Sequence, residues 1–155
     1  MLQQNILRML NEFIIEIKNE QWFGKERELV SRFAFSKLVK NVGCCEQLFD
    51  PAQIAIEVRV NQVKENGKKE VCKDLVIWGQ PNQTVWSSNN IPLCIMEWKH
   101  RKKFPHEYDI EWLEKYTASY ENCFGIALNV VNEGQYQLKA VLVEHGRRQE
   151  KIHVF

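Results

Sequence analysis

The chain has 155 residues, an apolar share of 45% and a formal net charge of +1 at pH 7. This length and composition are typical of one globular domain with a full hydrophobic core, so we expect residues 1–155 to form a single unit. A charge near zero excludes a global basic field for nucleic acid but leaves room for local basic patches. No apolar run reaches the length of a membrane span, and because charged residues interrupt the N-terminal apolar pattern, we do not expect a signal peptide.

The five cysteines are an odd number, contain no Cys-x-x-Cys pair and have apolar neighbours; they are Cys44, Cys45, Cys72, Cys94 and Cys123. This usage predicts reduced, mostly buried thiols and a cytoplasmic protein. The spacing of cysteines and histidines does not match a zinc site.

Apolar residues recur at helical spacing from Leu2 to Ile17. They predict one amphipathic helix within residues 1–19, which we treat as an extension of the core. A second helix is expected over roughly 25–41, where Gly43 ends it.

A hairpin is expected next. Apolar side chains alternate with polar ones at Ile54, Ile56, Val58 and Val60, which predicts a half-buried strand. Asn66-Gly67 favours a tight turn, and residues 70–78 form the return strand. If no bulge intervenes, Arg59 lies opposite Asp74 and Val58 lies opposite Leu75.

The remaining segments read as a strand over 91–99, a helix over 107–120, and strands over 124–131 and 136–143, with a last edge strand in 146–155. The order α-α-β-β-β-α-β-β indicates an α/β protein with a central mixed β-sheet flanked by helices.

Two charges lie in the apolar strand over 91–99. Strand alternation directs Glu97 and Lys99 to the same face, and burial of an unpaired charge costs several kcal/mol or more. An acid followed two residues later by lysine arises roughly twice by chance in this composition, and it occurs twice. Only this copy has a strand context, because Glu16-Ile17-Lys18 lies in a helical pattern. A plain ion pair between Glu97 and Lys99 is the alternative.

Asp74 lies in the strand before this one. Strands adjacent in sequence are usually adjacent in space, so Asp74 and Glu97 are expected to meet on one sheet face, with Lys99 one pleat further on. Two carboxylates suit Mg²⁺ or Mn²⁺. Lys99 would position a water or offset developing negative charge. The alternative for Asp74 is a cross-strand ion pair with Arg59.

This pattern resembles the PD-(D/E)XK nuclease superfamily, which has the restriction-endonuclease-like fold. The resemblance is carried by Asp74 in Lys73-Asp74-Leu75-Val76 and by Glu97-Trp98-Lys99 after an apolar run, and it covers residues 25–131. It implies a core of a helix, three antiparallel strands, a helix and a strand. Lys73 stands where the eponymous proline would be, and Trp98 fills a position usually held by a smaller apolar residue.

Many members of the superfamily add an acidic residue on the preceding helix, and Glu26-Arg27-Glu28-Leu29 resembles that element. We favour Glu26 over Glu28, because it shares a helix face with Leu29 and Val30. The alternative is an ordinary first-turn acid, favourable near a helix N-terminus.

A basic segment follows the strand. Arg101, Lys102 and Lys103 are candidate nucleic-acid contacts, and a solvated turn is the alternative. Trp86 and Tyr108 would stack on bases or, more ordinarily, pack against the protein.

These observations predict a Mg²⁺- or Mn²⁺-dependent nuclease that hydrolyses phosphodiester bonds, with DNA ahead of RNA as substrate. Asp74 and Glu97 would bind the metal, and Lys99 and Glu26 would complete the catalytic set. A non-catalytic module on the same fold, binding nucleic acid or a protein, is the main alternative, and another two-carboxylate hydrolase is a weaker one. The small size favours a homodimer or a larger assembly.

Overall fold

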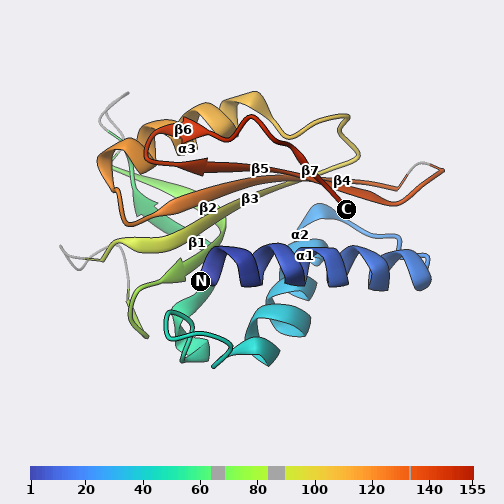
Figure 1. Ribbon diagram of the computed structural model, residues 1–155, viewed down its shortest axis with the longest axis horizontal. Coiled ribbons are helices and arrows are strands. Elements are labelled where there is room, and N and C mark those ends of the chain that lie inside the picture. Colours follow the sequence, from blue (N-terminus) through green and yellow to red (C-terminus); the bar gives the residue numbers. More distant parts are fainter. Residues whose placement is uncertain (64–68, 84–89, 133) are drawn as a thin grey trace.

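The computed structural model describes residues 1–63, 69–83, 90–132 and 134–155 (Figure 1). The expected Asn66-Gly67 turn and the candidate stacking residue Trp86 lie outside these ranges. The larger elements are α1 (Leu2–Asn19), α2 (Glu26–Phe33), β1 (Ile54–Asn61), β2 (Glu70–Trp78), β3 (Pro92–His100), α3 (Glu107–Ser119), β4 (Phe124–Val131) and β5 (Gln137–Glu144).

Short elements complete the chain. A π-helical segment, Ala34–Leu38, and a 3₁₀ turn, Val39–Asn41, continue α2, so helical structure runs to the predicted end. The tail holds two two-residue strands, β6 (Arg147–Arg148) and β7 (His153–Val154), in place of one edge strand. The predicted order of helices and strands is therefore confirmed.

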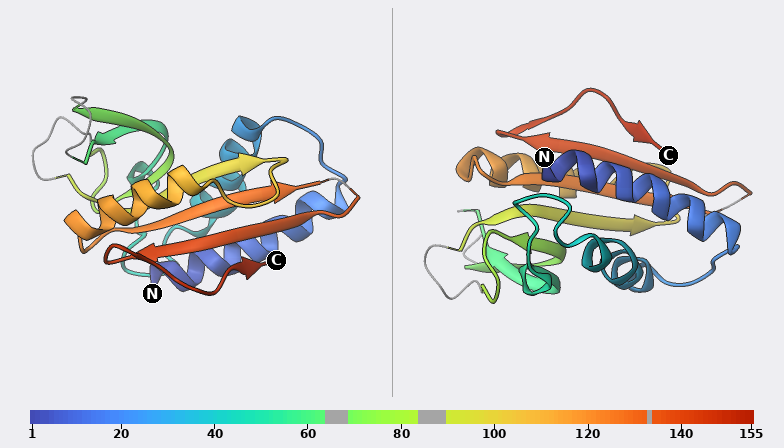
Figure 2. Two further views of the ribbon diagram at one scale, coloured as in Figure 1. Left: turned by 90° about the horizontal axis from the view of Figure 1, so that it is seen from above. Right: turned by 60° about the horizontal axis from the view of Figure 1, so that its bottom comes forward.

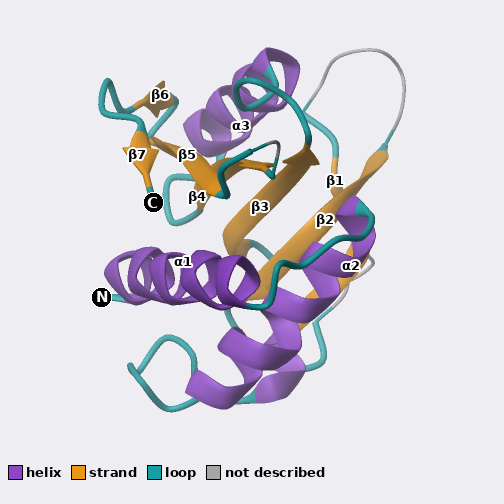
Figure 3. Cartoon of the chain, turned by 90° about the vertical axis from the view of Figure 1, so that its right-hand side faces the viewer, coloured by secondary structure: helices purple, strands orange, loops and turns teal. Residues whose placement is uncertain are grey.

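One mixed sheet joins all the strands, in the order β1-β2-β3-β4-β5-β6, with β7 also paired to β5. β3 and β4 are parallel, and the other neighbours are antiparallel. Helices α1 and α2 cover one face and α3 covers the other (Figures 2 and 3). The predicted α/β class with a mixed sheet flanked by helices is confirmed at this level.

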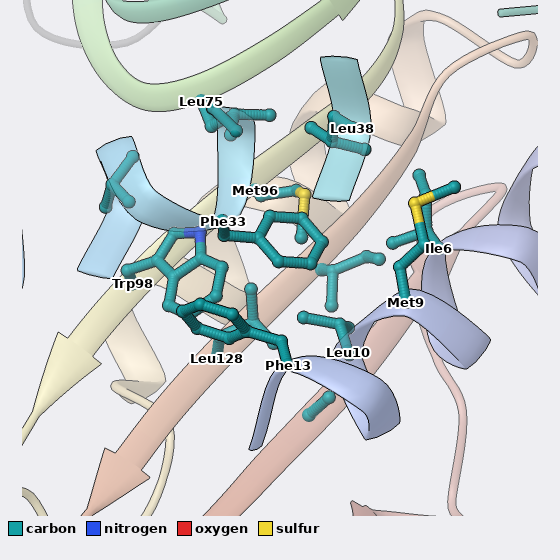
Figure 4. Close-up of a cluster of buried hydrophobic side chains, with 14 of the residues drawn as sticks. Ile6, Met9, Leu10, Phe13, Phe33, Leu38, Leu75, Met96, Trp98 and Leu128 are labelled. Carbon is teal, nitrogen blue, oxygen red and sulfur yellow. The ribbon is translucent and has the colours of Figure 1, made fainter. Parts of the chain in front are cut away.

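An aromatic cluster forms the centre of the core on the α1 and α2 side (Figure 4). The ring centroids of Phe13 and Phe33 lie 5.4 Å apart, and those of Phe33 and Trp98 are also 5.4 Å apart. The first pair is edge-on and the second is tilted, and neither is the face-to-face arrangement that aromatic rings avoid. Trp98 points into this core from β3 and packs against Phe13 of α1 and Phe33 of α2, which fixes the strand that carries the candidate site against both helices.

The predicted hairpin register is wrong by two residues. Arg59 pairs with Cys72, and its guanidinium lies 3.5 Å from the carboxylate of Glu70. Ile54 pairs with Ile77, and at this register both side chains contact the core. The proposed ion pair between Arg59 and Asp74 is therefore excluded.

The side chains of β1 also change face midway. Ile54 and Ile56 pack on the α2 side, whereas Val58 and Val60 pack on the α3 side. Between them, Glu57 has a left-handed φ of +51° and is skipped in the β1–β2 ladder. The expectation that the four apolar residues share one face is wrong, because this backbone turn inverts the alternation.

Only two of the five thiols are buried, those of Cys94 and Cys123. The expectation of mostly buried thiols is wrong, because Cys44 and Cys45 lie in a turn and Cys72 projects from the exposed side of the hairpin. All five are free. Within the described ranges, no helix is long and apolar enough to cross a membrane.

Candidate active site

β2 and β3 separate next to the candidate site. Their ladder runs from Trp78 to Leu75, which pairs with Met96, and does not continue to Asp74. The Asp74 carboxylate lies in the opening, where its Oδ2 accepts a 2.7 Å hydrogen bond from the backbone N–H of Trp98. A side chain thus replaces the missing backbone partner. This opening allows groups from both faces of the sheet to approach one another.

Glu97 lies on the α3 side of β3 and is 6% exposed. Its Oε1 accepts a hydrogen bond from the ammonium of Lys73, which is 4% exposed. The same ammonium lies 3.5 Å from the ring centroid of Trp112 on α3, a cation–π contact. Sequence interpretation did not identify Lys73 as a site residue. Its only visible signal was that it is a lysine within a strand, which does not by itself indicate burial.

Glu26 reaches the site from the first turn of α2. Its Oε2 accepts a 3.0 Å hydrogen bond from the backbone N–H of His100, and its Oε1 lies 4.0 Å from the Lys99 ammonium. Glu28 instead accepts a hydrogen bond from the backbone N–H of Lys25 and caps its own helix. Of the two acids on this helix, the structure brings Glu26 and not Glu28 into the group.

Lys99 is held by acids from both faces of the sheet. Its ammonium lies 3.4 Å from Oδ2 of Asp109 on α3, besides the contact with Glu26, and donates a 3.1 Å hydrogen bond to the carbonyl of Trp98. Among the described residues, Glu97 pairs with Lys73 and not with Lys99. The alternative of a plain Glu97–Lys99 ion pair is therefore wrong.

Asp109 is a second residue that the sequence interpretation missed. It occupies the first turn of α3, where an acid is ordinary on helix-dipole grounds alone. It is nevertheless 9% exposed, and its Oδ2 is buried without a hydrogen-bond partner although it faces Lys99 and His106. Only the packing of α3 over β3 reveals its place.

The carboxyl groups affect one another's protonation. Burial raises the pKa of Glu97 to about 7, with Lys73 opposing the rise and Asp74 adding to it. Burial also raises the pKa of Glu26, against the effect of Lys99. For Lys99, burial alone would lower the pKa, but Asp109 and Glu26 outweigh it and the pKa rises. Lys99 therefore carries its charge throughout the neutral range.

A cavity of about 260 Å³ opens beside Asp74 on the α2 side. Glu26, Val30, Ser31 and Ile56 are among the residues that line it. An ion pair between Arg27 and Glu57 lies at its wall, on exposed side chains. The cavity gives a small polar ligand access to Asp74 and Glu26, whereas Glu97, on the α3 side, is not among the residues that line it.

The predicted nucleic-acid contacts lie directly after β3 in the chain. Arg101, Lys102 and Lys103 are exposed and begin one residue after the end of β3. Tyr108 is 63% exposed, and its ring lies 6.3 Å from that of His106.

The carboxylate oxygens of the site are the type of ligand that hard divalent cations prefer. Asp74, Glu97 and Glu26 each have one carboxylate oxygen fixed by an N–H donor, which orients the other oxygen. Within the described residues, no group of three or more His, Cys, Asp or Glu side chains lies close enough together to hold a metal. A cation held by Asp74 and Glu97 would keep several waters, which is usual for Mg²⁺.

The comparisons with known proteins found no similarity: no family model, no curated protein and no solved structure matches this chain.

Proposed function

We propose that this chain is a metal-dependent nuclease on a restriction-endonuclease-like fold. The order α2-β1-β2-β3-α3-β4 supports the proposal, because it is the helix, three antiparallel strands, helix and strand that the resemblance requires. The observation that carries it is the convergence of Asp74, Lys99 and Glu26 where β2 and β3 separate, with Glu97 near enough on the α3 side to interact electrostatically with Asp74 and Lys99.

The residues have separable roles in this proposal. Asp74 and Glu97 would hold Mg²⁺ or Mn²⁺ through the oxygens that do not accept the Trp98 and Lys73 hydrogen bonds. A bound divalent cation supplies an activated water and neutralises charge on the phosphoryl oxygens. Lys99 donates to the attacking water or to a phosphate oxygen, and Glu26 holds Lys99 in place from the other side.

The experiment is cleavage of single-stranded DNA, duplex DNA and RNA with Mg²⁺ or Mn²⁺, for the wild type, Asp74→Asn and Lys99→Met. We expect chelator-sensitive cleavage that each variant lowers by about 100-fold or more, because Asp74→Asn removes a metal ligand and Lys99→Met removes the donor to the attacking water or phosphate oxygen. Glu12→Gln, at a partly exposed side chain of α1, and Lys40→Met, at an exposed side chain of the turn that continues α2, serve as matched controls. Wild-type cleavage by both site variants would refute the proposal.

One observation favours a second function, a non-catalytic binding module on the same fold. Glu97 already has a buried internal cation, Lys73, and needs no metal for its charge to be balanced. Calorimetry with Mn²⁺ separates the two functions. Metal binding that Asp74→Asn abolishes supports the nuclease. Nucleic-acid binding without any metal binding supports the module.

A further inference from the structure

The turn that follows β3 is held in one conformation. The side chain of Asn129, which is fully buried, donates a 2.6 Å hydrogen bond to the carbonyl of Lys102 and accepts a 3.2 Å hydrogen bond from its backbone N–H. The N–H of Arg101 donates to the carbonyl of Val130 at 2.9 Å. Arg101 has a left-handed φ of +64°, which costs an arginine free energy and persists only when neighbours fix it. A merely solvated turn needs no such buried clamp.

Two exposed aromatic rings flank this turn. Phe23 is 79% exposed and lies under the guanidinium of Arg101, with 4.8 Å from Cζ to the ring centroid. Phe104 is 52% exposed, and the ammonium groups of Lys103 and Lys139 lie 5.7 Å and 4.4 Å from its centroid. Each ring is thus paired with at least one cation in solvent-accessible surroundings.

Phe23 is held by its neighbour in the chain. Trp22 packs against His100, with 5.5 Å between the ring centroids, and its carbonyl accepts a 2.7 Å hydrogen bond from the hydroxyl of Tyr136. The segment before α2 is therefore tied both to the end of β3 and to the start of β5. These two contacts fix Phe23 beside the turn formed by Arg101, Lys102 and Lys103, which we call the basic turn.

We propose that Phe23, Arg101, Lys103, Phe104 and Lys139 form a binding platform for an unpaired nucleic-acid strand. The cations complement backbone phosphates, and the rings offer faces on which bases stack. Stacking of this kind requires bases whose faces are open, which a continuous duplex does not provide. The chemistry therefore selects a single strand, or a duplex with an unpaired arm, over uninterrupted duplex.

The position of the platform connects it with the carboxylates. Glu26 holds the backbone N–H of His100, and Arg101 is the next residue. A strand bound on the platform is delivered to the point where Lys99 and Asp74 lie. This second part rests on the proposed nuclease function, whereas the binding itself does not.

The test is fluorescence anisotropy of a labelled oligothymidine and of a blunt duplex of equal length, with the metal-free protein in chelator. We expect the single strand to bind about tenfold more tightly than the duplex. Phe23→Ala and Phe104→Ala should each weaken single-strand binding about fivefold or more without changing its dependence on salt. Arg101→Ala and Lys103→Ala should weaken it and also lower the salt slope, by about 0.7 for each phosphate that is no longer neutralised.

Phe49→Ala and Lys40→Ala are the matched controls. Phe49 is 47% exposed, and its backbone N–H donates a hydrogen bond to the side chain of Gln53. Gln53 in turn donates to the carbonyl of Trp78, which pairs with the first residue of β3. Phe49 is therefore near the opposite end of β3 from the basic turn. Both controls should bind as the wild type does. Equal affinity for duplex and single strand, or unchanged binding by both phenylalanine variants, would overturn the platform. Binding of neither nucleic acid would also overturn it and would leave a protein partner for this surface.

Failure of the platform and failure of the nuclease give different results. If Asp74→Asn binds the oligothymidine normally and the wild type cleaves nothing with any metal, the platform stands and the nuclease proposal fails. If the wild type cleaves and the phenylalanine variants bind and cleave as it does, the nuclease stands and the platform fails.

Discussion

The ammonium of Lys73 lies between the carboxylate of Glu97 and the face of Trp112, with less than a tenth of either charged side chain exposed. Removal of one member of a buried ion pair leaves the other charge without a partner, which is more costly than the loss of the pair as a whole. Lys73, on β2, therefore connects its own strand with β3 through Glu97 and with α3 through Trp112.

At pH 8, above the pKa of Glu97, Lys73→Met and Glu97→Gln should each lower the free energy of unfolding by about 3 kcal/mol, and the double variant should lose clearly less than the two combined. Urea denaturation of the four proteins measures this coupling. Arg8→Met and Glu12→Gln form the control cycle, because that pair is about half exposed and should couple by at most about 0.5 kcal/mol. Equal coupling in the two cycles would contradict a structural role for the buried pair.

Glu97 also predicts how stability depends on pH. Its pKa is about 7 in the folded protein against 4.5 as the ordinary value, so between these pH values the folded state holds a proton that the unfolded state has released. Its contribution to stability is thus full below pH 4.5 and is lost as the pH rises toward 7, on the order of 2–3 kcal/mol. Urea denaturation in chelator at several pH values should show this fall in the wild type and a smaller one in Glu97→Gln. Parallel curves would exclude Glu97 as its source.

Local sequence pattern was sufficient for much of this structure. The apolar run around Glu97 identified a buried central strand, because a strand covered on both faces is apolar along its length and does not alternate with polar residues. The pairing of β2 with β3 followed from their order in the chain. The choice of Glu26 over Glu28 followed from helix periodicity, and the contact with His100 agrees with it.

The rest depended on contacts that no local pattern encodes. The left-handed φ of Glu57, which inverts the faces of β1, carries no sequence signal, because glutamate is not a residue that favours it. Asp109 resembled any acid at a helix N-terminus until α3 was placed over β3. Lys73 resembled an ordinary surface charge, and its burial depends on Trp112, a residue 39 positions away in the chain.

Asp109→Asn should weaken the hold on Lys99, because it removes the charge that lies 3.4 Å from the ammonium. If the chain is a nuclease, we expect cleavage to fall about tenfold with little change in Mn²⁺ affinity, since Asp109 acts through Lys99 and not on the metal. Single-turnover cleavage and calorimetry measure the two effects. Glu111→Gln, an exposed change on the same helix, is the control. Asp109→Asn with full activity, beside an inactive Lys99→Met, would exclude a positioning role.

Asn129→Ala removes both hydrogen bonds that fix the backbone of Lys102, and it leaves the carbonyl and N–H of Lys102 without these partners. We expect a loss of about 1–3 kcal/mol in stability and, more specifically, faster tryptic cleavage after Arg101, Lys102 and Lys103, because a protease requires a segment that can leave its folded conformation. Mass spectrometry of early digests locates the cuts. Thr117→Val is the matched control, since Thr117 is equally buried and accepts a hydrogen bond from Gly146 in another turn. It should lower stability without exposing the basic turn. The same cleavage sites in both variants would mean that global unfolding, and not the loss of this clamp, admits the protease.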